Sequence, residues 1–276
     1  MAATLDIRAA AVAGRFYPGD PRALRRAVEG LLADAGPARS WRSQAPKALV
    51  VPHAGYRYSG PVAASAYACL REASPRIHRV VLLGPAHRVP VPGLALPGCG
   101  AFETPLGAIP VDAEGVRRLA ALAEVSVDPA AHAPEHSLEV QLPFLQVLLD
   151  AFTLLPLLVG GARPGAVAEA LEAVWGGPET LLVVSTDLTH YLPHAVASAL
   201  DQETCQRIAR LEAIEDPARA CGASALNGFL RVARARGLRA RLLDLRNSGD
   251  TAGDHAQVVG YAAFAFDEGA HGPSGA

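Results

Sequence analysis

The chain has 276 residues, half of them hydrophobic, with 25 basic and 27 acidic residues and a formal net charge of −2. This balance gives no electrostatic reason to bind nucleic acid or an anionic membrane surface, and no apolar run approaches the roughly 20 residues that cross a bilayer. The hydrophobic content is sufficient for a sizeable core and argues against global disorder.

The four cysteines have no CxxC spacing, which disfavours a disulfide framework or a zinc ribbon. Cys69 and Cys205 lie in helical patterns and are expected to be small core residues. The N-terminus has no basic region followed by an apolar stretch, so no signal peptide is expected. The sequence therefore predicts a reduced, cytoplasmic protein.

Strands and helices are predicted to alternate along the chain. Asp20 and Pro21 suit the N-cap and first turn of the first helix, and Gly36-Pro37 ends it. Helical spacing or capping residues predict helices at residues 21–35, 60–70, 112–123, 137–149, 164–174, 195–211 and 223–235. In the fourth of these, Pro143 either kinks the helix or moves its start to Leu142. Apolar runs bounded by Gly or Pro predict strands at residues 47–51, 79–83, 125–127, 153–159, 180–184, 238–245 and 258–266, with shorter ones at 93–96 and 108–111.

This alternation predicts an α/β fold with three layers: a mostly parallel central sheet with helices on both faces. Residues 36–46 are expected to form a loop. We find no internal repeat and no linker long enough to divide the chain. One domain is therefore expected over residues 1–276, with a core at about 10–267 and a flexible, Gly-containing tail at 268–276.

Three of the predicted strands are followed within a few residues by a histidine, namely His53, His87 and His190. In open α/β sheets, ligands bind at the carboxyl ends of the strands. If the three strands are parallel neighbours, their imidazoles converge, and neutral imidazoles bind Fe, Zn, Cu or Ni well. The alternative is that each histidine is an ordinary loop or capping residue.

Each of the other polar residues near these histidines allows two interpretations. Asp187, three residues before His190, can orient a histidine and raise its basicity, or it can be an N-cap. His136 and Glu139 are one helical turn apart, so both can line the pocket, or they can begin a solvated helix. The sequence contains no GxSxG, Walker, GxGxxG or HExxH motif.

Eight segments, in order, resemble the Memo family, whose prokaryotic members are called AmmeMemoRadiSam system protein B. They run from Gly14 to Phe266 and cover nearly the whole chain. The family is similar in fold to class III extradiol ring-cleaving dioxygenases (LigB-like), non-haem iron enzymes that open catechols. The segments are GRFYPGD, VVPHAGYRYSG, LLGPAHR, ETPLG, EHSLEVQLPFLQ, VVSTDLTHY, NSGDTAGD and VVGYAAF.

The resemblance implies a pocket for a divalent metal, Fe or Cu, at His53, His87 and His190. By analogy with the dioxygenases, His53 and His87 would be ligands, and His190 would be a third ligand or the catalytic base. The sequence departs from the family in residues 246–255, which contain neither the cysteine of animal Memo proteins nor the glutamate of the dioxygenases. This loop offers Asp250, Thr251 and Asp254 instead.

The expected function is metal binding with dioxygenase-like or redox chemistry, and the expected catalytic residues are His190, Asp187 and His136. One alternative is a non-enzymatic module that binds a peptide or a partner protein. The family name implies a functional link to a radical SAM protein and a further component of the AmmeMemoRadiSam system. A second alternative is metal-assisted hydrolysis, in which the metal activates water.

Overall fold

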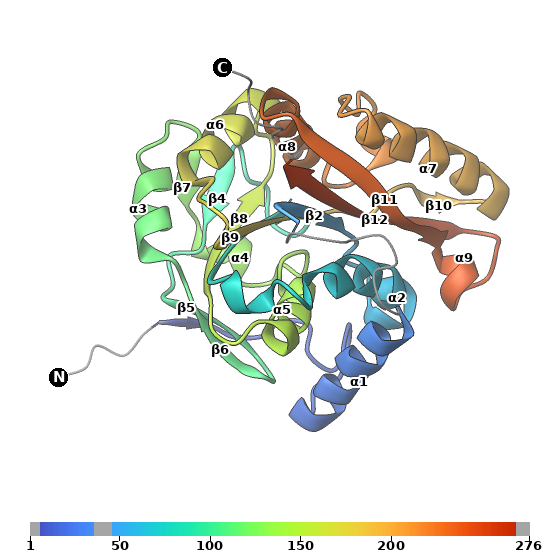
Figure 1. Cartoon of the computed structure of the whole chain (residues 1–276), viewed down its shortest axis with the longest axis horizontal. Coiled ribbons are helices and arrows are strands. Elements are labelled where there is room, and N and C mark those ends of the chain that lie inside the picture. The colour runs from blue at the N-terminus through green and yellow to red at the C-terminus, as the bar shows by residue number, and fades with distance from the viewer. Residues whose placement is uncertain (1–5, 36–45, 269–276) are drawn as a thin grey trace, which may run out of the picture.

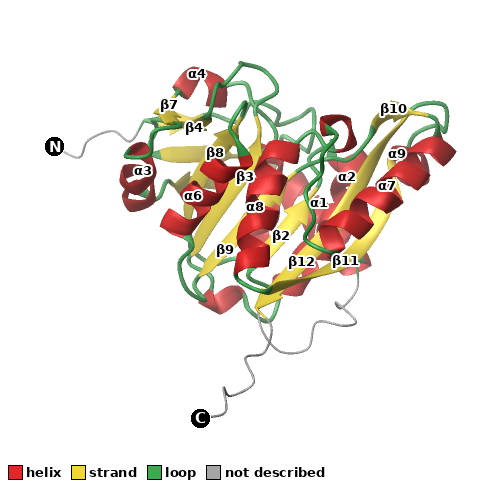
Figure 2. Ribbon diagram, turned by 90° about the horizontal axis from the view of Figure 1, so that it is seen from above, coloured by secondary structure: helices red, strands yellow, loops and turns green. Residues whose placement is uncertain are grey.

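A mixed nine-stranded sheet forms the centre of the computed structural model, which describes residues 6–35 and 46–268. The strand order is β10-β12-β2-β9-β3-β8-β4-β7, and β11 pairs with β12. Figure 2 shows the central strands side by side. The strands of this sheet are β2 (Ala48–Val51), β3 (Arg79–Pro85), β4 (Leu94–Leu96), β7 (Val125–Val127), β8 (Thr153–Val159), β9 (Thr180–Ser185), β10 (His190–Leu192), β11 (Leu238–Asn247) and β12 (Val258–Glu268).

The four central strands β2, β9, β3 and β8 are parallel. Antiparallel pairs flank them, β12 on β2 at one side and β4 on β8 at the other. A separate small sheet contains β1 (Ile7–Arg8), β5 (Ala101–Thr104) and β6 (Gly107–Pro110). The predicted α/β class with helices on both faces is confirmed.

Helices cover both faces of the sheet (Figure 1), because its central strands are apolar on both sides. In β2, Leu49 and Val51 belong to a core covered by α1, α2 and α5, whereas Ala48 and Val50 belong to a core covered by α6 and α8. The helices are α1 (Pro21–Asp34), α2 (Tyr56–Tyr67), α3 (Ala113–Ala120), α4 (Pro129–His132), α5 (Leu142–Leu148), α6 (Pro164–Val174), α7 (His194–Ala209), α8 (Ala223–Ala235) and α9 (Ser248–Thr251).

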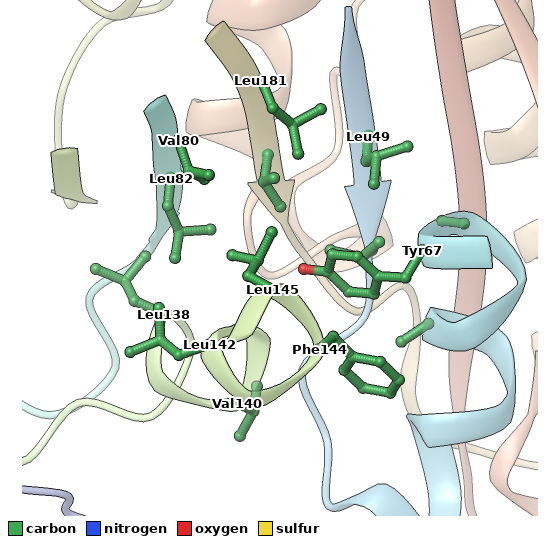
Figure 3. Packing of buried hydrophobic residues seen from close by; sticks show 14 of the residues in the cluster. Leu49, Tyr67, Val80, Leu82, Leu138, Val140, Leu142, Phe144, Leu145 and Leu181 are labelled. Carbon is green, nitrogen blue, oxygen red and sulfur yellow. The ribbon is translucent and has the colours of Figure 1, made fainter. Parts of the chain in front are cut away.

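Stacked aromatic rings and packed aliphatic side chains make up the first of these two cores (Figure 3). The rings of Tyr67 and Phe144 stack with centroids 4.9 Å apart and an interplanar angle of 8°. Each fully buried Leu or Phe of this kind contributes about 1.5–3 kcal/mol by leaving water. The core therefore fixes α5, and the segment just before it, against the carboxyl end of the sheet.

Two helices begin at positions that explain the sequence pattern. Helix α2 starts at Tyr56, four residues before the predicted start, with Gly55 as its N-cap. Tyr56 is buried, and its hydroxyl donates to the Val140 carbonyl. Helix α5 starts at Leu142, so Pro143 lies in its first turn, where a missing N–H costs little. The 3₁₀ turn Glu139–Gln141 precedes it.

The structure also contains short elements that the sequence pattern did not reveal, including β10, α4 and α9. The predicted loop 36–46 and tail 268–276 lie outside the described residues, except for residues 46 and 268. Within the described ranges, no helix has both the length and the apolar character needed to cross a bilayer.

Candidate metal centre

The three strands that precede the predicted histidines are neighbours. β2 and β3 both pair in parallel with β9, so their carboxyl ends meet at one edge of the sheet. A cavity of about 630 Å³ opens there. All five residues predicted for the site line this cavity, namely His53, His87, His136, Asp187 and His190.

Three imidazoles in this cavity form a tight cluster. Among the described residues, His53, His87 and His136 each offer a ligand atom, and these atoms lie within 4.8 Å of one another. The ring centroids are 5.0–5.5 Å apart. His136, predicted as a catalytic residue, thus lies with two of the predicted metal ligands, while His190 lines the same cavity outside the cluster.

His136 reaches the cluster because the chain after it packs closely on the end of β3. A Cβ at Gly84 would lie 2.8 Å from Ser137 Oγ and 2.9 Å from Leu138 Cδ2, so only glycine leaves room for this segment. The Ser137 hydroxyl then donates to the Pro85 carbonyl at 2.8 Å. This close packing and this hydrogen bond hold the loop at His87 against the segment that contains His136.

The tautomer of His53 follows from its hydrogen-bond partners. Ser185 Oγ donates its only proton to the Ser137 carbonyl at 2.7 Å and accepts from Gln141 Nε2 at 2.9 Å. It can therefore only accept from His53 Nδ1, which lies 2.9 Å away. His53 carries its proton on Nδ1 and presents the lone pair of Nε2. Burial, followed by the neighbouring His87 and His136, holds the pKa of His53 well below its usual value, which favours the neutral form that binds metals.

Glu135 is the carboxylate that orients the His87 ring and holds the backbone at His136. Its side chain accepts from the backbone N–H groups of His87, His136 and Ser137. Its Oε1 lies 3.0 Å from His87 Nδ1 and 3.1 Å from His136 Nδ1, the second contact being off the line of a hydrogen bond. Burial opposes ionisation of Glu135, but the neighbouring histidines and these N–H groups hold its pKa well below the usual range.

An ionised Glu135 only accepts, so the proton of His87 is on Nδ1 and its Nε2 is free for a ligand. Carboxylates that hold metal-binding histidines in this manner are frequent in metal sites. No motif or periodic pattern in the sequence pointed to Glu135. The available signal was its position next to His136.

The partners of Asp187 and His190 are backbone groups. Asp187 Oδ1 accepts the backbone N–H of His53 at 2.7 Å, and burial raises the pKa of this carboxyl. His190 Nδ1 lies 2.8 Å from the Leu188 carbonyl, which can only accept, so its Nε2 also carries a lone pair. Asp187 therefore orients the strand end at His53, and the backbone orients His190.

Of the remaining candidates, Glu139 is turned away from the cavity. It is fully buried and accepts from the Arg8 guanidinium, the Tyr17 hydroxyl and two backbone N–H groups. Asp250 completes the capping box of α9, whose N-cap is Asn247, and accepts from His194 Nε2 at 2.7 Å. Asp254 lines the cavity. The loop 246–255 thus offers one carboxylate to this space.

The donor set fits a transition metal. Two of the clustered imidazoles have their Nδ1 protons fixed by a hydroxyl or a carboxylate, which leaves Nε2 lone pairs for a metal, and imidazole suits Fe, Cu, Zn and Ni. His190 offers a fourth nitrogen from the cavity wall. Because His53 is almost completely buried while His87 is partly exposed, the cluster has a closed inner side and an open outer side.

Comparisons with known proteins agree with one another. The family model described as Memo-like protein matches residues 8–265. A MEMO1 family protein of Methanopyrus kandleri is 38% identical, with 95% of this chain and 99% of that protein covered. MEMO1 family proteins of Metallosphaera sedula and Sulfolobus acidocaldarius are 35% and 36% identical, with 95% of this chain and 99% and 100% of those proteins covered.

Among solved structures, an uncharacterized protein of Escherichia coli K12 has a similar fold. The TM-score is 0.52 at 14% identity, with 78% of this chain and 98% of that chain covered. At this identity the likeness concerns the fold alone.

Proposed function

This chain belongs to the Memo-like family, and from that premise we propose that its three-histidine cluster binds Fe or Cu and supports oxygen-dependent redox chemistry. The observation that carries the proposal is the convergence of His53, His87 and His136, with ligand atoms within 4.8 Å of one another. Three imidazoles that converge in this way are a donor set that suits Fe, Cu, Zn and Ni. Sharing a cation explains why they converge.

The residues around the cavity have different roles in this proposal. The cluster binds the metal, Glu135 orients His87, and Ser185 orients His53. A bound Fe or Cu would supply a Lewis acid and a one-electron redox centre. His190 faces the cavity with an Nε2 lone pair and would accept a proton from a substrate hydroxyl.

The test is the metal content of protein purified without an affinity tag. His53→Ala, His87→Ala and His136→Ala should each lower Fe or Cu occupancy, measured by mass spectrometry. The matched control is His78→Ala, which removes an exposed histidine just before β3, at its opposite end. Unchanged occupancy in all three variants would exclude the metal centre.

His190→Ala separates the two roles predicted for this residue. Loss of metal from His190→Ala would make it a ligand. Retained metal with loss of oxygen uptake, measured across a panel of catechols, would make it the base. If the native, metal-loaded protein consumes no oxygen with any catechol, the redox part of the proposal is wrong.

A second candidate function is recognition of a peptide or partner protein at the mouth of the same cavity. Tyr191 favours it, because this residue is 69% exposed and has a φ of 57°, a strained conformation for a tyrosine. Tyr58 adds a second exposed aromatic side chain to the cavity wall. A radical SAM protein of the AmmeMemoRadiSam system would be the partner, and Tyr191→Ala should weaken its capture without lowering metal content.

A further inference from the structure

A cysteine thiol lies against His53, the buried member of the histidine cluster. Cys221 Sγ is 3.3 Å from His53 Nε2, the nitrogen that carries the lone pair. Cys221 comes from a distant part of the chain, directly before α8, whose N-cap is Gly222. A Cβ at Gly222 would lie 2.8 Å from Thr186 Cβ and 2.9 Å from the Ser185 carbonyl, so glycine is needed for this approach.

The sulfur is placed to accept hydrogen bonds. The backbone N–H of Asp187 points at Cys221 Sγ from 3.3 Å. The thiol proton has an acceptor in the Asp187 carbonyl, 3.7 Å from the sulfur. Burial and the Asp187 carboxylate raise the pKa of this thiol, so a metal ion that binds the sulfur has to displace its proton. Asp187, which supplies this N–H group, also accepts from the His53 backbone, so one residue positions both the imidazole and the thiol.

The distance between sulfur and nitrogen fits two neighbouring ligands of one ion. Metal–nitrogen bonds of about 2.0–2.1 Å and metal–sulfur bonds of about 2.3 Å place the two atoms roughly 3.5 Å apart in a tetrahedral site. The Cys221 sulfur is at 3.3 Å, on the side of His53 Nε2 that accepts hydrogen bonds. A metal ion bonded to this nitrogen therefore meets the sulfur, which must either bind the ion or be displaced by it.

We propose that Cys221 is a thiolate ligand of the metal held by the histidine cluster, an inference that rests on the proposed metal-binding function. When the metal binds, the S–H bond breaks, the proton leaves to solvent, and a sulfur lone pair forms the bond to the metal. No electron is transferred in this step. A thiolate beside imidazoles makes the site softer, so it favours Zn or Cu over Mn or Mg.

The test is titration of the metal-free full chain with Co(II), followed by absorption spectroscopy. Native protein should develop a near-ultraviolet band from thiolate-to-cobalt charge transfer that saturates at one equivalent of Co(II). Cys221→Ser should lose this band and bind Co(II) more weakly, by at least the roughly 10-fold that loss of an outer-sphere partner causes. The control Cys205→Ser, in a buried position on α7, should keep the band.

The possible outcomes separate this inference from the proposed function. If native protein binds Co(II) through its histidines but shows no charge-transfer band, the thiolate ligand is wrong and the metal centre stands. If native protein binds neither Co(II) nor Zn(II), both are wrong. If circular dichroism shows that Cys221→Ser does not fold, the other three cysteines are replaced one at a time, as Cys69→Ser, Cys99→Ser and Cys205→Ser. If all three variants keep the native band, the band belongs to Cys221. Loss of the band in any of them overturns that assignment.

Discussion

Glu135 and Glu139 are two buried carboxylates, four residues apart, with opposite surroundings. Glu139 pairs with the guanidinium of Arg8 and also accepts from Tyr17 and the backbone at Ala11 and Val12. Glu135 accepts only from N–H groups and the His87 imidazole. Among the described residues, no Lys or Arg side chain pairs with the Glu135 carboxylate.

This difference distinguishes a structural anchor from a functional carboxylate. The charge of Glu139 is neutralised within the protein, and its bonds tie the N-terminal segment to the turn before α5. The charge of Glu135 is compensated only by dipoles, so a cation bound to His87 and His136 would be attracted to it. Glu135 is therefore a better indicator of a metal site than Glu139, because it lies next to converging imidazoles and no Lys or Arg side chain of the described residues pairs with it.

Removing the anchor should have the largest effect on stability. Glu139→Ala leaves the buried Arg8 guanidinium unpaired, and breaking a buried ion pair in this way costs about 3–5 kcal/mol. Urea unfolding followed by circular dichroism measures the loss. The control Glu114→Ala breaks two exposed ion pairs on α3 and should change stability little. A fall for Glu139→Ala no larger than the control would contradict the anchor role.

The segment next to the Glu139 anchor should also lose stability in acid, because it contains His132. Its carbonyl accepts from Arg8, its Nε2 donates to the Ala95 carbonyl, and its buried Nδ1 has no partner among the described residues. Burial, more than any other cause, lowers the pKa of His132 from 6.5 to about 4. Between these pH values the unfolded chain binds a proton that the folded chain does not.

Stability from His132 is therefore complete above pH 6.5 and is lost as the pH falls toward 4. The shift corresponds to about 3 kcal/mol at its limit. Unfolding free energies at pH 7 and pH 4 should differ less in His132→Gln than in native protein. Parallel pH profiles for the two proteins would show that His132 does not titrate on unfolding.

Replacing the functional carboxylate should reduce metal affinity rather than the fold. Glu135→Gln keeps the shape of the side chain but removes its charge and one acceptor for the His87 ring. Loss of such a partner weakens metal binding about 10–100-fold, or roughly 1.4–2.7 kcal/mol. Titration with Zn(II), monitored by calorimetry, measures it.

The matched control for this prediction is Glu139→Gln. It should lower stability while leaving the metal affinity of the folded protein unchanged. If both variants lose affinity equally, the distinction between the two carboxylates does not hold.

The sequence predicted the position of the site because strand ends can be read locally. Continuous apolar runs identified β2, β3 and β9, and His53 and His87 follow two of them directly. The parallel order of these strands then brings the loops together. His190 was predicted by the same rule, but β10 begins at that residue and pairs with β12, which places the imidazole on the cavity wall.

The sequence could not predict which other residues reach the cluster. Glu135 and Cys221 arrive through close packing at Gly84 and Gly222, and neither approach has a periodic pattern. His136 was considered a site residue, but its partner Glu139 faces the opposite way, since the 3₁₀ turn after it does not follow α-helical spacing. Such contacts depend on tertiary structure and leave no local signal.

The smallest effect on stability is expected from a change in the chain of hydrogen bonds between uncharged side chains behind His53, which Tyr67, Gln141 and Ser185 form. The Tyr67 hydroxyl donates to Gln141 Oε1 at 3.0 Å, and Gln141 Nε2 donates to Ser185 Oγ and to the Pro52 carbonyl. Tyr67→Phe removes one hydrogen bond between uncharged groups, which costs about 0.5–1.5 kcal/mol.

Metal affinity should be unchanged in Tyr67→Phe, because Gln141 keeps both of its donor contacts and Ser185 still accepts from His53. Unfolding and Zn(II) titration of the same preparation measure both quantities. An affinity loss as large as that of Glu135→Gln would mean that the whole chain of hydrogen bonds from Tyr67 to Ser185, rather than Ser185 alone, fixes the His53 tautomer. The comparison would then change, since the metal site would depend on two polar supports of equal weight, one charged and one neutral.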